Sequence, residues 1–360
     1  MQDTRSAWRI AIRMFWFAGA ALSGATLAAQ PGIASNLNDQ GLAAAGSGDY
    51  ARAERLYGES LQKWRALGSP YDAHTAATLA NLGQALCNAG RWREGIGALE
   101  QALALHRRTL GSKHERTVYN LSQLGHAYVL AADPGRAEAV LSEALATERE
   151  LYPGDKLLGH TLLGMSLLRR LEGRLDDSLQ IGDEALNEAL KSGGELSTGA
   201  AMAYENVGIL HRLAGRPERA LPLFRKARFI YERTVGSANT MFISALSQEG
   251  LALLDDGEMT LAERDMTQAV NALSKMGPAS DYPLATAESN LGLLRLRQRK
   301  LADAERLLTH ALTLEERLPS PPVSDMSATL GLLAKLRKAQ RRDAESAQLS
   351  ARAADLQTAR

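Results

Sequence analysis

Small and hydrophobic residues follow a helical period in two successive parts of Leu110–Leu151. Leu124-Gly125 lie in the middle of the first part. Ala137, Leu141 and Ala144 follow in the second part at spacings of four and three residues, which places them on one face of a helix. Small residues let two antiparallel helices approach closely, and the larger Leu141 fills the space between them. The segment is therefore predicted to form a helical hairpin.

The same pattern returns about every 42 residues along the chain. Three positions of the hairpin keep small residues in nearly every copy. The first-helix position holds Gly41, Gly83, Gly125, Ser166, Gly208, Gly250, Gly292 and finally Leu332. The two second-helix positions hold Ala53, Gly95, Ala137, Ser178, Ala220, Ala262, Ala304 and Ala344, and then Ser60, Ala102, Ala144, Ala185, Ala227, Ala269, Ala311 and Ala351. Repetition at a fixed period predicts an array of stacked units.

We therefore predict an all-α fold, a solenoid of about eight helical hairpins that forms one domain over residues 37–360. Aromatic residues make up only 5% of the chain. This low share suits a solenoid, because each hairpin buries its faces against its neighbours and no central aromatic-rich core is needed. The expected units are residues 37–68, 73–111, 115–152, 156–193, 197–236, 239–277, 281–318 and 322–358.

The repeat resembles the tetratricopeptide repeat, whose second helix carries an alanine, an aromatic or large apolar residue and a second alanine. Tyr57 and Phe224 match the aromatic position. That family usually has a period of 34 residues, and the longer period found here is similar to that of kinesin-light-chain repeats. Their linking stretch, Leu-Gly-x-x-His-Pro-x-Thr, is matched by residues 110–117 with Glu115 in place of the proline. From about Asn38 onward, the resemblance implies a right-handed α–α superhelix whose concave wall is lined by the first helices.

Residues 1–29 do not follow the repeat. Three arginines precede an uncharged run, Met14–Ala29, which ends in small residues and is typical of a secretory signal peptide cleaved after Ala28 or Ala29. Residues 30–36 are then expected to form a flexible leader. The expected location is the periplasm of a bacterium or the medium outside it. An uncleaved anchor in the inner membrane is the alternative, although the run is short for a span of about 20 residues.

Charge and composition exclude several classes of function. Without residues 1–29 the chain keeps 39 basic and 40 acidic side chains, so no general nucleic-acid binding is indicated. The single Cys87 cannot form an intramolecular disulfide and is expected in the core. The seven histidines are scattered, and the carboxylate pairs Asp176-Asp177 and Asp255-Asp256 fall at hairpin turns. We therefore expect a protein that is not an enzyme and that uses no cofactor and no metal.

The candidate site is the concave wall. In the family that the chain resembles, the residue two before the first-helix glycine faces this wall. That position reads Asp39, Asn81, Gln123, Gly164, Asn206, Gln248, Asn290 and Leu330. An amide carries a donor and an acceptor and suits the backbone of an extended peptide. The alternative is that these amides bridge adjacent helices.

One helical turn further along, the wall is expected to be polar at Gln84 and His126. It is expected to be apolar at Leu167, Ile209, Leu251 and Leu293. Apolar residues here suggest pockets for partner side chains, with ordinary helix packing as the alternative. The candidate partner-binding residues are Asn81, Gln84, Gln123, His126, Asn206, Gln248 and Asn290.

The predicted function is that of a non-catalytic scaffold or adaptor which holds a partner protein or an extended peptide in its groove. One alternative is a membrane-anchored assembly subunit of an envelope complex, which requires that the N-terminal segment stays uncleaved. A cytoplasmic peptide-sensing regulator is a further alternative. It is disfavoured because no DNA-binding helix-turn-helix precedes the array.

Overall fold

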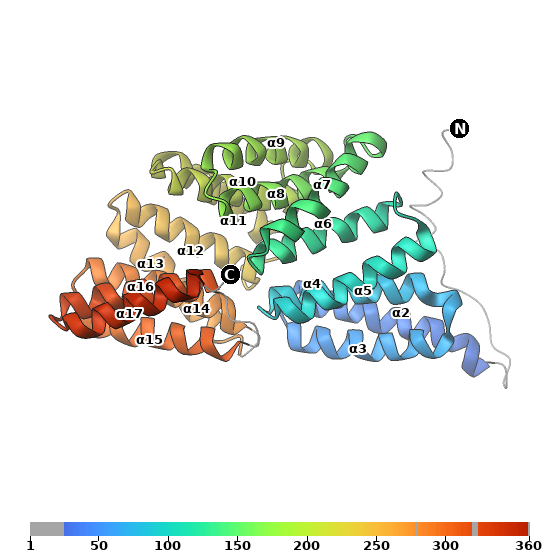
Figure 1. The fold of residues 1–360 in the computed structure, drawn as a ribbon, viewed down its shortest axis with the longest axis horizontal. Coiled ribbons are helices and arrows are strands. Elements are labelled where there is room, and N and C mark those ends of the chain that lie inside the picture. Colours follow the sequence, from blue (N-terminus) through green and yellow to red (C-terminus); the bar gives the residue numbers. More distant parts are fainter. Residues whose placement is uncertain (1–24, 278–279, 319–322, 359–360) are drawn as a thin grey trace.

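The computed structural model describes residues 25–277, 280–318 and 323–358, and in these ranges the chain forms helices and no strands. Eight antiparallel helical pairs follow one another (Figure 1). The pairs are α2 (Ala25–Gly46) with α3 (Tyr50–Leu67), α4 (Asp72–Asn88) with α5 (Trp92–Leu110), α6 (Glu115–Leu130) with α7 (Pro134–Leu151), α8 (Lys156–Leu171) with α9 (Leu175–Gly193), α10 (Thr198–Leu213) with α11 (Pro217–Thr234), α12 (Thr240–Asp255) with α13 (Met259–Leu273), α14 (Asp281–Arg297) with α15 (Leu301–Arg317), and α16 (Val323–Ala339) with α17 (Asp343–Thr358). A short 3₁₀ helix, η1 (Ser69–Tyr71), links the first two pairs. The predicted all-α solenoid is confirmed.

The turns inside the pairs follow from local sequence. After α6, the carboxylate of Asp133 caps α7 by accepting a hydrogen bond from the backbone N–H of Arg136 at 3.1 Å. After α4, Gly90 has a φ of +78°, a left-handed conformation that glycine adopts without strain. Gly90 thus lets the chain turn after α4, and Asp133 fixes the start of α7.

The small residues seen in the repeat lie where the paired helices touch. Leu141 lies directly over Gly125, and Phe224 lies over Gly208, where an added Cβ would be 2.9 Å from the phenylalanine ring. Ala137 is fully buried. The hairpins therefore depend on the absence of side-chain volume at these positions, as the repeat predicted.

The last pair has a different register from the one predicted. Ala344 is exposed, whereas Ser346 donates its hydroxyl hydrogen bond to the carbonyl of Ala334 at 2.9 Å. The equivalent bond in the fourth pair runs from Ser178 to the carbonyl of Ser166 at 2.7 Å. The last unit therefore aligns through Ala334 and Ser346 instead of Leu332 and Ala344, which restores a step of 42 residues.

The structure tests only part of what was predicted for residues 1–36. Most of the expected signal peptide lies outside the described residues, and so does its apolar run as far as residue 24. The expected flexible leader, residues 30–36, is wrong because α2 already spans it. Packing explains the helix, since Ala34 is fully buried and its carbonyl accepts a hydrogen bond from the Ser60 hydroxyl of α3 at 2.7 Å. Within the described ranges, none of the helices has the length and apolar character needed to span a bilayer.

The superhelix turns far enough for distant pairs to meet. In Figure 1, α2–α5 lie on one side and α12–α17 on the other, joined by the arch of α6–α11. The side-chain amide of Asn239 donates a hydrogen bond to the carbonyl of Gly46. The rings of Trp92 and Tyr282 meet edge to face, with centroids 5.2 Å apart. These closing contacts bring the start of the array against its sixth and seventh pairs.

Candidate functional site

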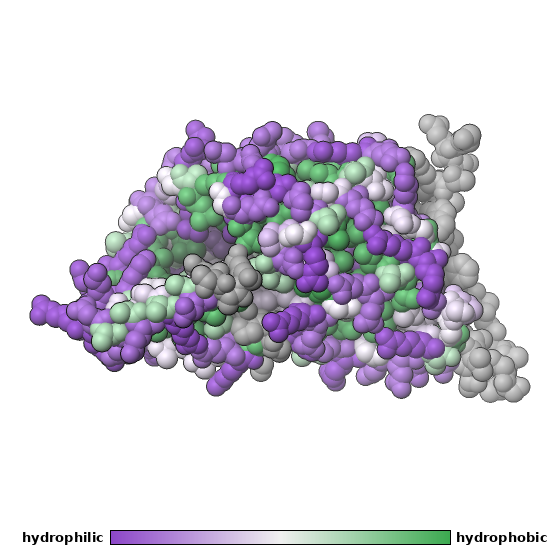
Figure 2. All heavy atoms as spheres, in the orientation of Figure 1, coloured by the Kyte–Doolittle hydropathy of each residue, from purple (hydrophilic) through white to green (hydrophobic). Residues whose placement is uncertain are grey.

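A cavity of about 360 Å³ lies at the centre of this closed superhelix. Its walls come mainly from the first helices of consecutive pairs, α4, α6, α8, α10, α12 and α14. Hydrophilic side chains cover most of the face seen in Figure 2, and hydrophobic ones show between them towards the middle. We call this space the central cavity. It is lined by Tyr50, Cys87, Asn88, Trp92, His126, Leu130, Leu163, Leu167, Met202, Glu205, Asn206, Ile209, Tyr231, Thr240, Met241, Ser244, Tyr282 and Pro283.

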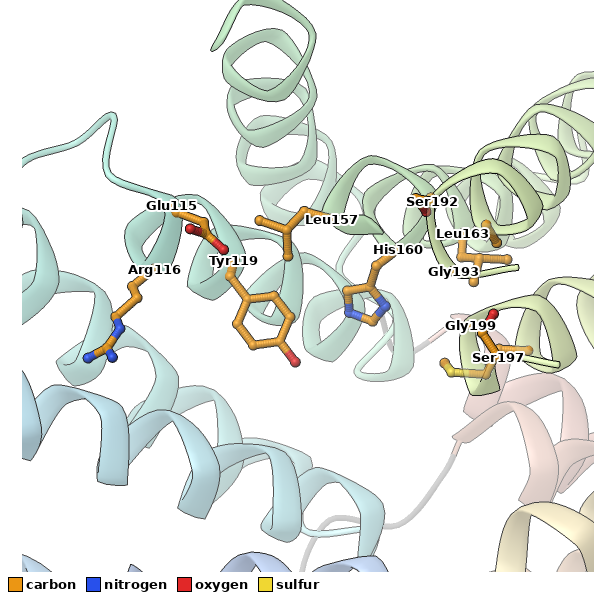
Figure 3. Close-up of a pocket in the computed structure, with 13 residues that line it drawn as sticks. Glu115, Arg116, Tyr119, Leu157, His160, Leu163, Ser192, Gly193, Ser197 and Gly199 are labelled. Atoms are coloured by element: carbon orange, nitrogen blue, oxygen red, sulfur yellow. The ribbon is translucent and has the colours of Figure 1, made fainter. Parts of the chain in front are cut away.

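A second space of about 490 Å³, the edge pocket, opens beside it at the N-terminal ends of α6, α8 and α10. Figure 3 shows the side chains of Tyr119 and His160 pointing into this opening. Leu163 and Met202 line both spaces, so the edge pocket and the central cavity adjoin. Together they form a concave site that runs across several repeats.

A pair of stacked imidazoles separates the two spaces. The rings of His126 and His160 are parallel within 7° and have centroids 4.3 Å apart. Nε2 of His126 lies 2.9 Å from the backbone carbonyl oxygen of His160. Burial lowers the pKa of both, and that of His160 to about 3, so the rings stay neutral at ordinary pH.

Gly164 is what makes room for this pair. A Cβ on Gly164 would lie 2.8 Å from Nε2 of His126. The glycine that interrupts the predicted row of carboxamides therefore has a packing reason.

Three of the predicted carboxamides, the asparagines, bridge neighbouring first helices through their amide nitrogens. Nδ2 of Asn81 donates to Oδ1 of Asn38 at 3.0 Å. Nδ2 of Asn206 donates to the hydroxyl oxygen of Ser166 at 2.9 Å, and Nδ2 of Asn290 donates to that of Ser247 at 3.1 Å. The N–H groups of these amides therefore bridge adjacent helices, as the alternative interpretation expected.

The acceptor oxygens of the row are different. Within the part of the chain that the structure describes, buried Oε1 of Gln123, Oδ1 of Asn206 and Oε1 of Gln248 have no hydrogen-bond partner. A buried acceptor without a donor is costly. Of these three residues, only Asn206 lines the central cavity.

The structure brings only some of the predicted residues to the central cavity. His126 and Asn206 line it, and so do Leu167 and Ile209 from the predicted apolar turn. Gln84 reaches it indirectly, because its amide donates to Oδ1 of the lining residue Asn88 at 3.1 Å. Asn81, Gln123, Gln248 and Asn290 are not among the lining residues, and Leu251 and Leu293 belong to a hydrophobic cluster of the core.

The sequence patterns missed Glu205, which lies next to Asn206 on α10 and also lines the cavity. Its Oε1 accepts a hydrogen bond from the Ser244 hydroxyl at 2.8 Å, and its Oε2 accepts one from the Tyr231 hydroxyl at 3.1 Å. Burial raises the pKa of Glu205 to about 7, although the two hydroxyls lower it. The available signal was a single charged residue at a repeat position that is uncharged in the other units.

No candidate metal centre accompanies these residues. Over the described ranges, no three His, Cys, Asp or Glu side chains are grouped closely enough to hold a metal ion. Cys87 lines the central cavity and is buried, and its burial raises the pKa of the thiol to about 12. The site therefore offers binding groups: aromatic and aliphatic walls, unpaired acceptors and one carboxyl.

The fold and the site define a helical repeat solenoid with a concave binding surface. Residues 75–150 and 157–233 match the family model described as tetratricopeptide repeat. Over these residues the chain contains tetratricopeptide repeats, and the helical pairs on either side have the same antiparallel arrangement.

The chain is similar to Protein KINESIN LIGHT CHAIN-RELATED 2 of Arabidopsis thaliana, with 24% identity over 319 residues, covering 87% of this chain and 48% of that protein. It thus spans about half the length of this curated relative. The solved structure of NprR in complex with its cognate peptide NprX has a TM-score of 0.67 at 14% identity, over 98% of this chain and 92% of that one. The structure of Rap protein complexed with Competence and Sporulation Factor has a TM-score of 0.64 at 13% identity, over 90% of this chain and 98% of that one. At these identities the likeness shows the shared fold.

Proposed function

We propose that this protein binds an extended peptide, or an extended segment of a partner protein, in the central cavity and the adjoining edge pocket. The proposed role is that of a non-catalytic scaffold or adaptor. The observation that carries it is a concave site that first helices of six consecutive pairs build together. Such a wall presents regularly spaced groups to a chain that lies along it.

The polar groups of the central cavity suit a peptide backbone. Nε1–H of Trp92 is a buried donor and Oδ1 of Asn206 a buried acceptor, and neither has a hydrogen-bond partner among the described residues. A peptide unit offers one carbonyl and one N–H, so a bound backbone that reaches these two atoms would supply a partner to each. Leu167, Ile209 and Met202 add apolar wall for its side chains.

The likeness to two complexes supports the same role. NprR is solved with its cognate peptide NprX and Rap with Competence and Sporulation Factor, and both have folds that match this chain over at least nine tenths of its length. Because the identities are low, this support concerns the architecture, and the partner must be found by experiment.

Photo-crosslinking tests this proposal. The photoreactive residue p-benzoylphenylalanine replaces Leu130, an exposed residue at the wall of the central cavity, or Phe229, an exposed residue of α11 that serves as the matched control. With random-sequence synthetic peptides as the probe, we expect peptides of related sequence to be captured at position 130 and not at 229. Capture at both positions alike, or at 229 alone, would place binding outside the groove.

We also propose that the chain is exported, on the basis of the basic and apolar pattern of its first 29 residues. N-terminal sequencing of the purified protein tests this, together with fractionation of the cells that make it. A mature N-terminus near Gln30 in the periplasm or medium supports export with cleavage. An intact Met1 in the membrane fraction supports the anchored alternative, and an intact Met1 in the cytoplasm contradicts both.

A further inference from the structure

Glu205 is the one carboxyl group among the residues that line the central cavity, and no lysine or arginine lines it. The other titratable groups of the lining are neutral near pH 7. Burial lowers the pKa of His126 and raises those of Cys87, Tyr50, Tyr231 and Tyr282. The only negative charge that the lining can present is therefore that of Glu205.

Many other carboxylates of the array pair with a basic side chain. Glu249 pairs with Arg225 and Arg228, and Glu263 pairs with Arg295. Glu205 makes no ion pair within the described part of the chain, and its two hydrogen bonds come from hydroxyl groups. A carboxylate oxygen has two lone pairs, so both oxygens can still accept a hydrogen bond from a ligand.

The repeat itself marks Glu205 as exceptional. Counting three residues back from the first-helix small position gives Asn38, Ala80, Ser122, Leu163, Glu205, Ser247, Ser289 and Gly331. The other seven are uncharged, so packing in the array does not require a carboxyl at this place. A partly buried acid there costs stability through desolvation, and a cationic ligand would offset that cost.

We propose that Glu205 binds an ammonium or guanidinium group of the peptide held in the groove. This inference rests on the proposed function and deepens it, because it states the chemistry of one peptide position. The hydroxyls of Ser244 and Tyr231 hold the two carboxylate oxygens in place, at 2.8 and 3.1 Å. The rings of Trp92 and Tyr282 line the same cavity and suit the aliphatic stem or charged end of a basic side chain.

The test uses the full chain and peptides captured at position 130 from the random library. Glu205→Gln keeps the size of the side chain and removes its charge, and Glu232→Gln removes the charge of an exposed residue of α11 as the matched control. We expect the captured peptides to share a basic residue. Replacing that residue by norleucine should weaken binding to the unsubstituted protein about tenfold or more. The same replacement should change binding to the Glu205→Gln variant about threefold or less, while Glu232→Gln behaves as the unsubstituted protein.

Acetylation of the peptide N-terminus separates the two sources of positive charge. A loss of affinity on acetylation identifies the α-ammonium group, and an unchanged affinity identifies a side chain. Thermal melts establish that the variants are folded. Capture at position 130 with neither a basic preference nor a loss of affinity on acetylation would overturn this proposal and leave the groove as a peptide site, and so would a norleucine effect of equal size in Glu205→Gln. No capture at position 130 would contradict the proposed function as well.

Discussion

Two buried carboxyl groups show how the repeat tolerates an unusual residue in its core. Glu148 and Glu315 occupy equivalent places, four residues after the second small position of their second helices, and both are at most 1% exposed. Each accepts a hydrogen bond from a threonine of the next first helix, Thr161 at 2.8 Å and Thr329 at 2.9 Å. Burial raises their pKa values to about 7 and about 8. The folded protein therefore holds both as neutral acids over most of the acidic range.

This arrangement predicts a pH-dependent stability. An unfolded glutamate has a pKa of about 4.3, so between that value and the raised folded values the native state binds more protons than the unfolded state. The free energy of unfolding should then fall as pH rises from about 4 to about 8, by about 4 kcal/mol for each group. Thermal melts of the Glu148→Met/Glu315→Met double variant should lose less stability over this range than those of the unsubstituted protein.

Glu59→Met, a change at an exposed position of α3, is the control and should leave the pH dependence as it was. Equal slopes for the double variant and the unsubstituted protein would show that the two carboxyls ionise freely in the folded state.

At the scale of one hairpin, backbone atoms limit how closely the two helices approach in the α4–α5 pair. A Cβ on Gly83 would lie 2.8 Å from the carbonyl oxygen of Gly95 and 2.7 Å from Cγ of Leu99. A Cβ on Gly95 would likewise lie 2.8 Å from the carbonyl oxygen of Gly83. A side chain can turn away from such a contact, but a carbonyl oxygen moves only with its helix.

Gly83→Ala is therefore expected to destabilise the protein, by about 1–3 kcal/mol, because the α4–α5 pair must separate. Gly97→Ala is the matched control. This position lies on α5 with no atom near its Cβ site, so the change should stabilise by up to about 1 kcal/mol through helix propensity. Urea titrations followed by circular dichroism measure both changes. A midpoint for Gly83→Ala at or above that of the unsubstituted protein would contradict the close approach.

Periodicity explains which parts of this picture the sequence could predict. Small residues such as Gly125 and Ala137 repeat because every hairpin needs them, so the fold and most helix pairs were predictable. The last unit was misaligned because its alanine-rich second helix offers several small residues near the expected place, Ala344 among them. Glu205 was missed for the opposite reason, since it departs from the repeat in a single unit.

The row of carboxamides shows a second limit of prediction from the sequence. The sequence placed Asn206 on the correct face of its helix. Its hydrogen bond to Ser166, however, depends on the distance between neighbouring first helices. That distance is set by the packing between helices, and the spacing of residues along one helix does not predict it.

At the scale of the whole molecule, the central cavity exists because the superhelix closes. The closing contacts join the start of the array to its sixth and seventh pairs, and they link residues about 190 positions apart. One of them is the hydrogen bond between the hydroxyls of Tyr50 and Thr240, whose oxygens are 3.4 Å apart. No local pattern predicts such a contact, because it depends on the small rotation accumulated from each repeat to the next. The closing contacts are also few compared with the stacked helix faces, so opening at this place is expected to cost least.

Asn239 offers a way to weaken the closure without disturbing a helix. Its Oδ1 caps α12 by accepting a hydrogen bond from the backbone N–H of Met241 at 2.9 Å, while its Nδ2 donates to the carbonyl oxygen of Gly46. Asn239→Asp keeps a good cap but places a carboxylate oxygen against that carbonyl, which replaces a hydrogen bond of about 1 kcal/mol by repulsion. We expect a larger radius of gyration in small-angle X-ray scattering, with the helical circular dichroism unchanged. Ser197→Asp adds the same charge at the cap of α10, away from the closing contacts, and should leave the scattering unchanged. Identical scattering from Asn239→Asp and Ser197→Asp would mean that this bond does not hold the closing contacts together, and that closure rests on the other contacts, such as the packing of Trp92 against Tyr282.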